Sequence, residues 1–149
     1  MRPLAHDSRK PLAEAFALGQ PGSWQVELPI ILDLHDTRLA GLSGPGFLFE
    51  ASCLYLHRGY RWDGSSGVRD SEMCLVASAF HDAAVEAIDQ SDLGWVARWR
   101  LRRWADWQYG RICAVNGMAA PRAGGRFLGL RVLGPVFRVY RWWQRIVAR

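Results

Sequence analysis

Residues 73–88 form an uninterrupted run of residues that favour a helix. The run MCLVASAFHDAAVEAI is dominated by good helix formers and contains neither Gly nor Pro. Asp70 or Ser71 can cap its N-terminus, and the early acidic residues suit the positive end of a helix. The sequence therefore predicts a helix that begins near Asp70 or Ser71 and continues to about residue 88.

The chain before this helix has the composition of β-structure. Residues 23–34 are rich in apolar and β-branched side chains and predict a strand, in which Pro29 indicates an edge or a bend. Residues 38–46 predict a turn region, and the partial alternation over residues 47–62 predicts one or two further strands. Residues 1–22 contain prolines, polar residues and the short helical run LAEAFAL. We expect them to form an arm that is loosely packed or docked on another surface.

The chain after this helix predicts two more helices. Ser91 or Asp92 can cap a second helix over residues 93–115, and Gly and Pro residues make residues 117–125 a linker. Residues 126–149 again show helical spacing.

The order of these segments predicts an α+β fold. A small N-terminal antiparallel β layer would pack against about three C-terminal helices. A length of 149 residues suits one domain, which we place at residues 23–149 after an arm at residues 1–22.

The three cysteines do not form a recognisable metal or disulfide pattern. Cys53, Cys74 and Cys113 lie far apart and show no CxxC spacing, so we interpret them as small core residues in a reducing compartment. The first residues lack the apolar core of a signal peptide, and no apolar run is long enough to span a membrane.

A group of polar residues links a loop to the first helix. The loop GYRWDGSS (59–66) precedes FHDA (80–83), in which His81 lies on an otherwise apolar helix face. His81 is either a core histidine bonded to a backbone carbonyl, or a general base or metal ligand. Asp63 likewise either stabilises a turn or, together with Ser65 or Ser66, faces His81 across a cleft.

Asp106 is a further candidate on the predicted second helix. Arg102 and Arg103 precede it by four and three residues, which predicts an ordinary helical ion pair. The flanking Trp104 and Trp107 indicate partial burial instead, which would bring Asp106 toward the same polar group.

The segments GYRWDGSSGVR, ASAFHDAAVEA and RRWADWQY together resemble the DUF1353 family of small phage and prophage proteins. The resemblance covers about residues 46–143, and this chain departs from the family loop at Gly67-Val68. The fixed positions of the family fall on Gly59, Asp63, Gly64, Ser66, His81, Asp82, Ala105 and Asp106. The resemblance implies a phage or prophage gene and a shared polar cluster. It implies no reaction, because the function of the family is unknown.

Two functions are compatible with this polar cluster. In a small hydrolase-like enzyme the catalytic candidates are Asp63, Ser66, His81, Asp82 and Asp106. In that case His81, Asp82 and Asp63 are candidate ligands for a divalent metal ion, the only cofactor that this set suggests. In an accessory or virion-associated protein, the same residues would form a structural network.

The C-terminal segment is a candidate binding surface. Arg138, Arg141 and Arg145 recur on one face of a predicted amphipathic helix, next to Trp142 and Trp143. This helix either packs on the domain or binds a virion or host protein, with an anionic membrane surface as a further alternative. No recognised motif favours nucleic acid. Eight tryptophans favour the accessory protein, which we expect in the host cytoplasm or the virion.

Overall fold

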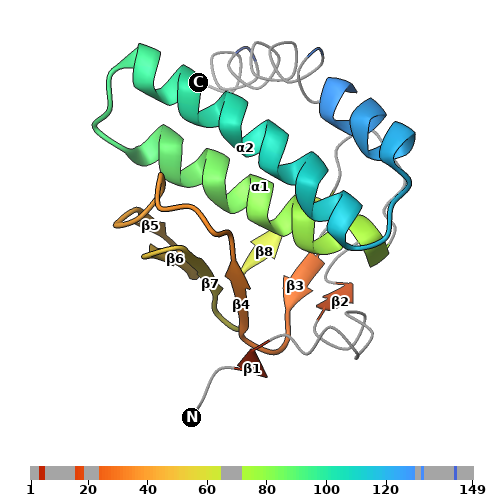
Figure 1. Cartoon of the computed structure of the whole chain (residues 1–149). Coiled ribbons are helices and arrows are strands. Elements are labelled where there is room, and N and C mark those ends of the chain that lie inside the picture. The colour runs from red at the N-terminus through yellow and green to blue at the C-terminus, as the bar shows by residue number, and fades with distance from the viewer. Residues whose placement is uncertain are drawn as a thin grey trace.

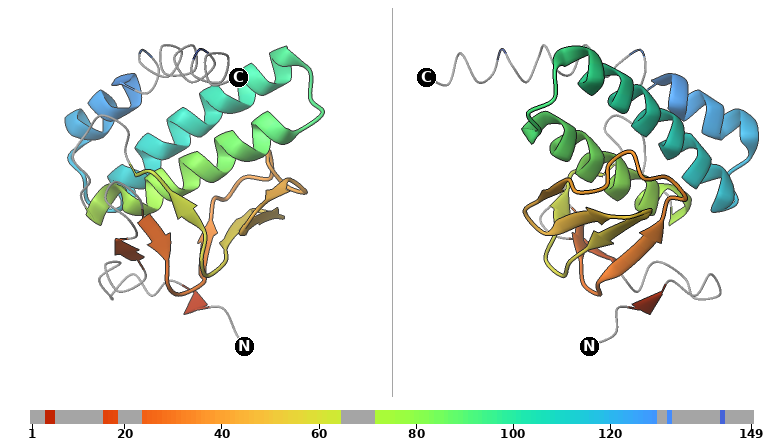
Figure 2. Two further views of the ribbon diagram at one scale, coloured as in Figure 1. Left: turned by 180° about the vertical axis from the view of Figure 1, so that it is seen from behind. Right: turned by 60° about the vertical axis from the view of Figure 1, so that its left-hand side comes forward.

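Strands from the N-terminal half form one layer, and two long helices lie side by side across it (Figure 1). The computed structural model describes residues 4–5, 16–18, 24–64 and 72–129, together with the isolated helical positions 132 and 143. Figure 2 shows the same two layers from behind and from the side. This arrangement confirms the predicted α+β class.

The strands belong to two sheets. The five-stranded sheet has the order β1-β4-β7-β6-β5, and the three-stranded sheet has the order β2-β3-β8. Neighbouring strands are antiparallel except β1 and β4, which are parallel. The strands are β1 (Leu4–Ala5), β2 (Phe16–Leu18), β3 (Trp24–Val26), β4 (Ile30–Asp33), β5 (Ser43–Gly44), β6 (Phe47–Glu50), β7 (Cys53–Leu56) and β8 (Arg61–Trp62).

Pro29 separates two strands where the sequence predicted one. β3 ends at Val26 and β4 begins at Ile30, and the two strands lie in different sheets. A proline has no N–H to donate to a strand partner, so the chain changes sheet at this position. The segment 47–62 likewise contains three strands, because turns follow both β6 and β7.

The N-terminal segment contributes strands rather than a helix. β1 pairs with β4, and β2 pairs with β3 through the partners Phe16 and Val26, Ala17 and Gln25, and Leu18 and Trp24. The predicted helical run LAEAFAL is therefore wrong at residues 16–18. A short run of helix formers has little stability alone, and pairing with a strand edge overrides it.

The helices begin and end somewhat differently from the prediction. α1 spans Glu72–Gln90 and α2 spans Trp95–Val115. Gly94 is the N-cap residue of α2 without a side-chain cap, whereas the predicted cap Ser91 donates its hydroxyl to the Ile88 carbonyl at 2.7 Å. Ser91 thus closes the last turn of α1 instead of opening α2.

A third helix replaces most of the predicted linker. Residues 120–129 are helical, so the interpretation of 117–125 as a linker is wrong beyond residue 119. Pro121 is tolerated because it lies in the first turn, where its missing N–H would have no partner in the helix. A Cβ at Gly110 would lie 3.4 Å from the Phe127 Cβ, which shows how closely this helix approaches α2.

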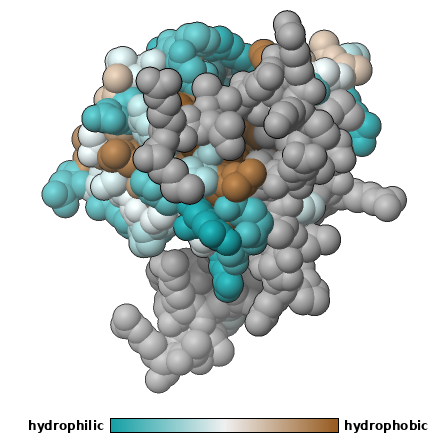
Figure 3. Space-filling view, turned by 90° about the horizontal axis from the view of Figure 1, so that it is seen from below, coloured by the Kyte–Doolittle hydropathy of each residue, from teal (hydrophilic) through white to brown (hydrophobic). Residues whose placement is uncertain are grey.

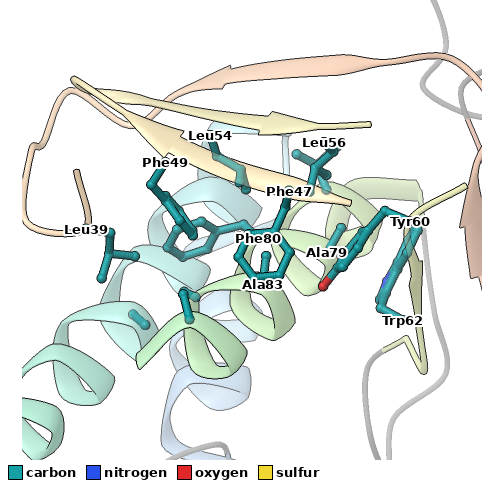
Figure 4. Packing of buried hydrophobic residues seen from close by; sticks show 14 of the residues in the cluster. Leu39, Phe47, Phe49, Leu54, Leu56, Tyr60, Trp62, Ala79, Phe80 and Ala83 are labelled. Atoms are coloured by element: carbon teal, nitrogen blue, oxygen red, sulfur yellow. The ribbon is translucent and has the colours of Figure 1, made fainter. Parts of the chain in front are cut away.

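An aromatic core joins the strands to α1 (Figure 4). Phe49 of β6 meets Phe80 of α1 edge to face, with ring centroids 6.5 Å apart. Tyr60 and Trp62 stack with their centroids 6.1 Å apart, and the Trp62 Nε1–H donates to Ser78 Oγ at 3.0 Å. These contacts fix the end of β8, and with it Asp63, against α1.

The surface on the strand side differs from this core. Its described part mixes hydrophilic and neutral residues with small hydrophobic groups (Figure 3). Within the described residues, no helix has the length and apolar character required to cross a membrane.

Candidate functional site

His81 connects the two long helices near their middle. Its Nε2 lies 2.9 Å from Asp106 Oδ1 of α2, and its Nδ1 lies 3.8 Å from Asp82 Oδ1 of α1. The side chains of His81 and Asp106 are 15% and 16% exposed, so water screens this pair only weakly. Both ring nitrogens of His81 therefore face carboxylates.

This arrangement keeps His81 protonated. Burial alone would lower its pKa, but the hydrogen bonds to Asp106 and Asp82 outweigh burial and raise the pKa to about 9. At neutral pH the imidazolium donates from Nε2 to Asp106 at 2.9 Å, and its Nδ1 lies within ion-pair distance of Asp82, at 3.8 Å. A protonated histidine in this position serves as a hydrogen-bond donor and a positive charge between two carboxylates.

The carboxyl of Asp82 also interacts with the carboxyl of Asp63, which follows β8. Burial raises the pKa of Asp82 to about 6, and a hydrogen bond with the Asp63 carboxyl adds to the increase. The Asp63 side chain is exposed, at the point where the chain leaves β8. Burial also raises the pKa of the nearby Tyr60 hydroxyl, helped by the charges of Asp82, Glu86 and Asp63. Asp63 after β8, Asp82 of α1 and Asp106 of α2 thus each place a carboxyl in the neighbourhood of His81.

A second polar contact lies behind His81. The Tyr109 ring stands edge to face against the imidazole, with centroids 5.8 Å apart. The nearly buried Arg126 donates to the Tyr109 hydroxyl at 3.3 Å and to Cys74 Sγ at 3.2 Å. Arg126 thereby ties the 120–129 helix to α1 and α2. The predictions from sequence missed this arginine, and only its spacing within the amphipathic C-terminal segment could have suggested burial.

The candidate metal ligands His81, Asp82 and Asp63 do not have the geometry of a metal site. Among the residues that the structure describes, no three His, Cys, Asp or Glu side chains are arranged to hold a metal ion. His81, Asp82 and Asp63 lie close together, but the two nitrogens of His81 are directed at carboxylates. The set is therefore better described as a hydrogen-bonded ion-pair cluster.

Several predicted residues are not among those that the structure describes. Ser65 and Ser66 lie outside the described residues, as do Arg138, Arg141, Trp142 and Arg145. Trp143 is described as a helical position with 60% of its surface exposed. The predicted binding surface of the C-terminal segment therefore stays a prediction.

The exposed side of α2 carries a second candidate site. Trp95, Trp99, Arg103, Trp107 and Arg111 follow one another at intervals of four residues, and all five are exposed. We call this row the Trp–Arg ridge. The Arg103 Cζ lies over the Trp99 ring at 4.7 Å from its centroid, and the Arg111 Cζ lies over the Trp107 ring at 5.8 Å. Sequence reasoning noted the tryptophans of this helix but did not identify the ridge.

The inner side of α2 makes the contacts of this helix with the strand layer and α1 that the structure describes, and the residues of the outer side are exposed. The Trp104 Nε1–H donates to Asp36 at 3.1 Å, and the buried Gln108 donates to the Leu34 carbonyl at 2.9 Å. These bonds and the ion pair of Asp106 hold one face of α2 on the rest of the molecule. Trp104 and Trp107, which flank Asp106 in sequence, consequently have opposite environments.

Comparison of the chain with protein-family models, with curated proteins and with solved structures finds no match. The resemblance to DUF1353 stays a prediction from the sequence.

Proposed function

We propose that this chain is an accessory or virion-associated protein of a phage or prophage that acts through protein–protein contacts. The observation that carries the proposal is the Trp–Arg ridge. Trp95, Trp99 and Trp107 are 78%, 48% and 52% exposed on one helix. Tryptophan and arginine are the residues most enriched at the energetic centres of protein interfaces.

The state of His81 supports a structural role for the Asp/His cluster. A catalytic base needs a free lone pair near neutral pH, whereas the hydrogen bonds of His81 raise its pKa to about 9. The ion pair with Asp106 instead fixes α2 on α1. In this proposal the Asp/His cluster holds α2, which carries the Trp–Arg ridge, in place.

The alternative is a small hydrolase-like enzyme, and one observation favours it. The pKa of Asp82 is raised to about 6, so this carboxyl can exchange a proton near neutral pH beside Asp63. In such an enzyme Asp82 would be the general acid or base, and protonated His81 would orient it.

The experiment compares co-purification and catalysis in one set of variants. The tagged chain is expressed in cells that carry its phage or prophage, and bound proteins are quantified by mass spectrometry. We expect a specific protein to be lost with Trp99→Ala/Trp107→Ala and retained with the control Leu128→Ala, which alters an exposed apolar residue of the 120–129 helix. Hydrolysis of ester or phosphoester substrates that Asp82→Asn abolishes without unfolding the chain would contradict the proposal.

A further inference from the structure

The Trp–Arg ridge has the geometry of a helix-packing row. Side chains four residues apart form a continuous row that is inclined to the helix axis, and such rows interdigitate in the commonest class of helix–helix packing. The ridge extends from Trp95 to Arg111 over most of α2. Its shape therefore suits a second helix that crosses α2 at an angle.

A flat surface would contact this row less completely. Twelve residues separate Trp95 from Trp107, and a helix turns about 100° per residue, so their directions differ by about 120°. A lipid bilayer that touches one of these rings would leave the other in water. A crossing helix follows the inclination of the row instead.

The two arginines of the ridge are prepared to bind carboxylates. Arg103 lies over Trp99 and Arg111 lies over Trp107, so each side chain is held at an aromatic ring. A guanidinium in this position keeps its N–H groups in its own plane, where they can form paired hydrogen bonds with a carboxylate. Neither arginine forms an ion pair with any residue that the structure describes.

The charge of α2 selects the sign of the partner. This helix contains five arginines and a single acidic residue, Asp106, which is paired with His81. Arg102 is paired with Asp89, and the Arg98 Nε–H donates to the Leu93 carbonyl. The exposed arginines are Arg100, Arg103 and Arg111. The outer face of α2 is therefore basic and aromatic, and its complement is acidic and apolar.

We infer that the Trp–Arg ridge binds an acidic amphipathic helix of a partner protein. Arg103 and Arg111 are eight residues apart, or about 12 Å along the helix axis. The partner places carboxylates about two turns apart against these guanidiniums, with apolar side chains between them against Trp99 and Trp107. This inference rests on the proposed function and specifies the chemistry of its partner.

The test uses the full chain and two synthetic helical peptides of identical composition. In the first, two Glu residues are eight positions apart on either side of a Leu-rich stripe. In the second, the same residues are shuffled so that the stripe and the Glu spacing are lost. Binding is measured by fluorescence anisotropy of labelled peptide. We expect the first peptide to bind at least tenfold more tightly, and its binding to weaken as NaCl is raised.

Three variants test the geometry of the site. Trp99→Ala/Trp107→Ala and Arg103→Glu/Arg111→Glu should each weaken binding of the first peptide at least tenfold. Arg103→Lys/Arg111→Lys keeps the charge but removes the planar guanidinium, so it should lose part of the affinity. The control Leu128→Ala should bind like the wild type. All these positions are exposed, and unchanged melting temperatures would show that the variants are folded.

Several results would overturn the inference. One is equal binding of the two peptides. Another is ridge-dependent binding to phosphatidylserine vesicles or to duplex DNA in the absence of peptide binding. A dimer in light scattering that Trp99→Ala/Trp107→Ala dissociates would identify a second copy as the occupant. If both peptides fail but the ridge is still required for co-purification of a protein, the proposed function stands and the acidic-helix inference fails.

Discussion

At the scale of single residues, His81 shows what the sequence could predict and what only the structure reveals. The apolar helix face and the His-Asp pair predicted a polar cluster with Asp63, Asp82 and Asp106, and the structure brings these four residues together. One of the two interpretations of His81 was a core histidine bonded to a backbone carbonyl, whereas in the structure both ring nitrogens face carboxylates. The protonation state depends on distances across two helices, which residue spacing does not contain.

The raised pKa values make the stability of the protein depend on pH. The pKa of His81 rises from 6.5 to about 9, so its contribution is complete below pH 6.5 and is lost as the pH rises through 9. Replacing His81 with Asn should therefore lower the free energy of unfolding by about 1–3 kcal/mol at pH 6. At pH 9.5 the difference from the wild type should be clearly smaller. Urea denaturation at both pH values measures the effect.

The exposed His57 provides the matched control for this prediction. His57→Asn should leave the free energy of unfolding unchanged at both pH values. An equal loss at pH 6 and pH 9.5 in His81→Asn would show that the imidazole contributes by packing alone. Asp82 affects stability at lower pH. Its pKa rises from 3.8 to about 6, so the protonated carboxyl stabilises the fold at low pH, and this stabilisation is lost as the pH rises through this range.

At the scale of elements, Gly110 marks the contact between α2 and the 120–129 helix. A Cβ at this position would lie 3.4 Å from the Phe127 Cβ and 3.6 Å from the Ala123 carbonyl oxygen, which is ordinary contact. Gly110→Ala should therefore be neutral or stabilise α2 by up to about 1 kcal/mol, because alanine favours a helix. Gly110→Val should destabilise by about 1–3 kcal/mol, because its extra methyl groups have no space beside Phe127.

Thermal and urea unfolding of the two variants test this prediction side by side. Equal stability of Gly110→Ala and Gly110→Val would mean that the 120–129 helix does not pack on α2 in solution. The sequence could not predict this contact, because Gly124 and Gly125 made the segment look like a linker. Packing of Ala123 and Arg126 against α1 and α2 stabilises the helix despite its glycines.

At the scale of the whole molecule, the fold class could be predicted and the sheet order could not. Strand-like segments before helix-forming segments are sufficient to indicate α+β. The division into two sheets depends on Pro29 and on the pairing of β2 with β3, which the sequence pattern does not specify. The positions of β1 and β2 could not be predicted either, because they depend on pairing with β4 and β3.

The reactivity of the three cysteines can be used to follow unfolding of the helices. Cys74 and Cys113 are fully buried where α1 and α2 meet the 120–129 helix, and Cys53 is half-buried on β7. Burial also raises the pKa of the Cys113 thiol to about 11. A thiol reagent at pH 8 should therefore label Cys53 quickly and the other two only at the rate of unfolding.

Peptide mapping of the labelled protein identifies the order of reaction. Addition of urea near the midpoint of unfolding should make all three thiols react at similar rates. Rapid labelling of Cys113 in the native protein would contradict this prediction, because it would show that the helices separate without global unfolding.

The inner bonds of α2 have a consequence for the speed of association. Trp104, Asp106 and Gln108 hold this helix by contacts to Asp36, His81 and the Leu34 carbonyl, and these contacts fix which face of α2 points inward. If the ridge binds a partner helix as proposed, its side chains are carried by a helix that is already fixed before the partner arrives. Binding would then resemble the docking of a rigid body, which loses little conformational entropy in this chain. A slow ordering step would in that case occur in the partner.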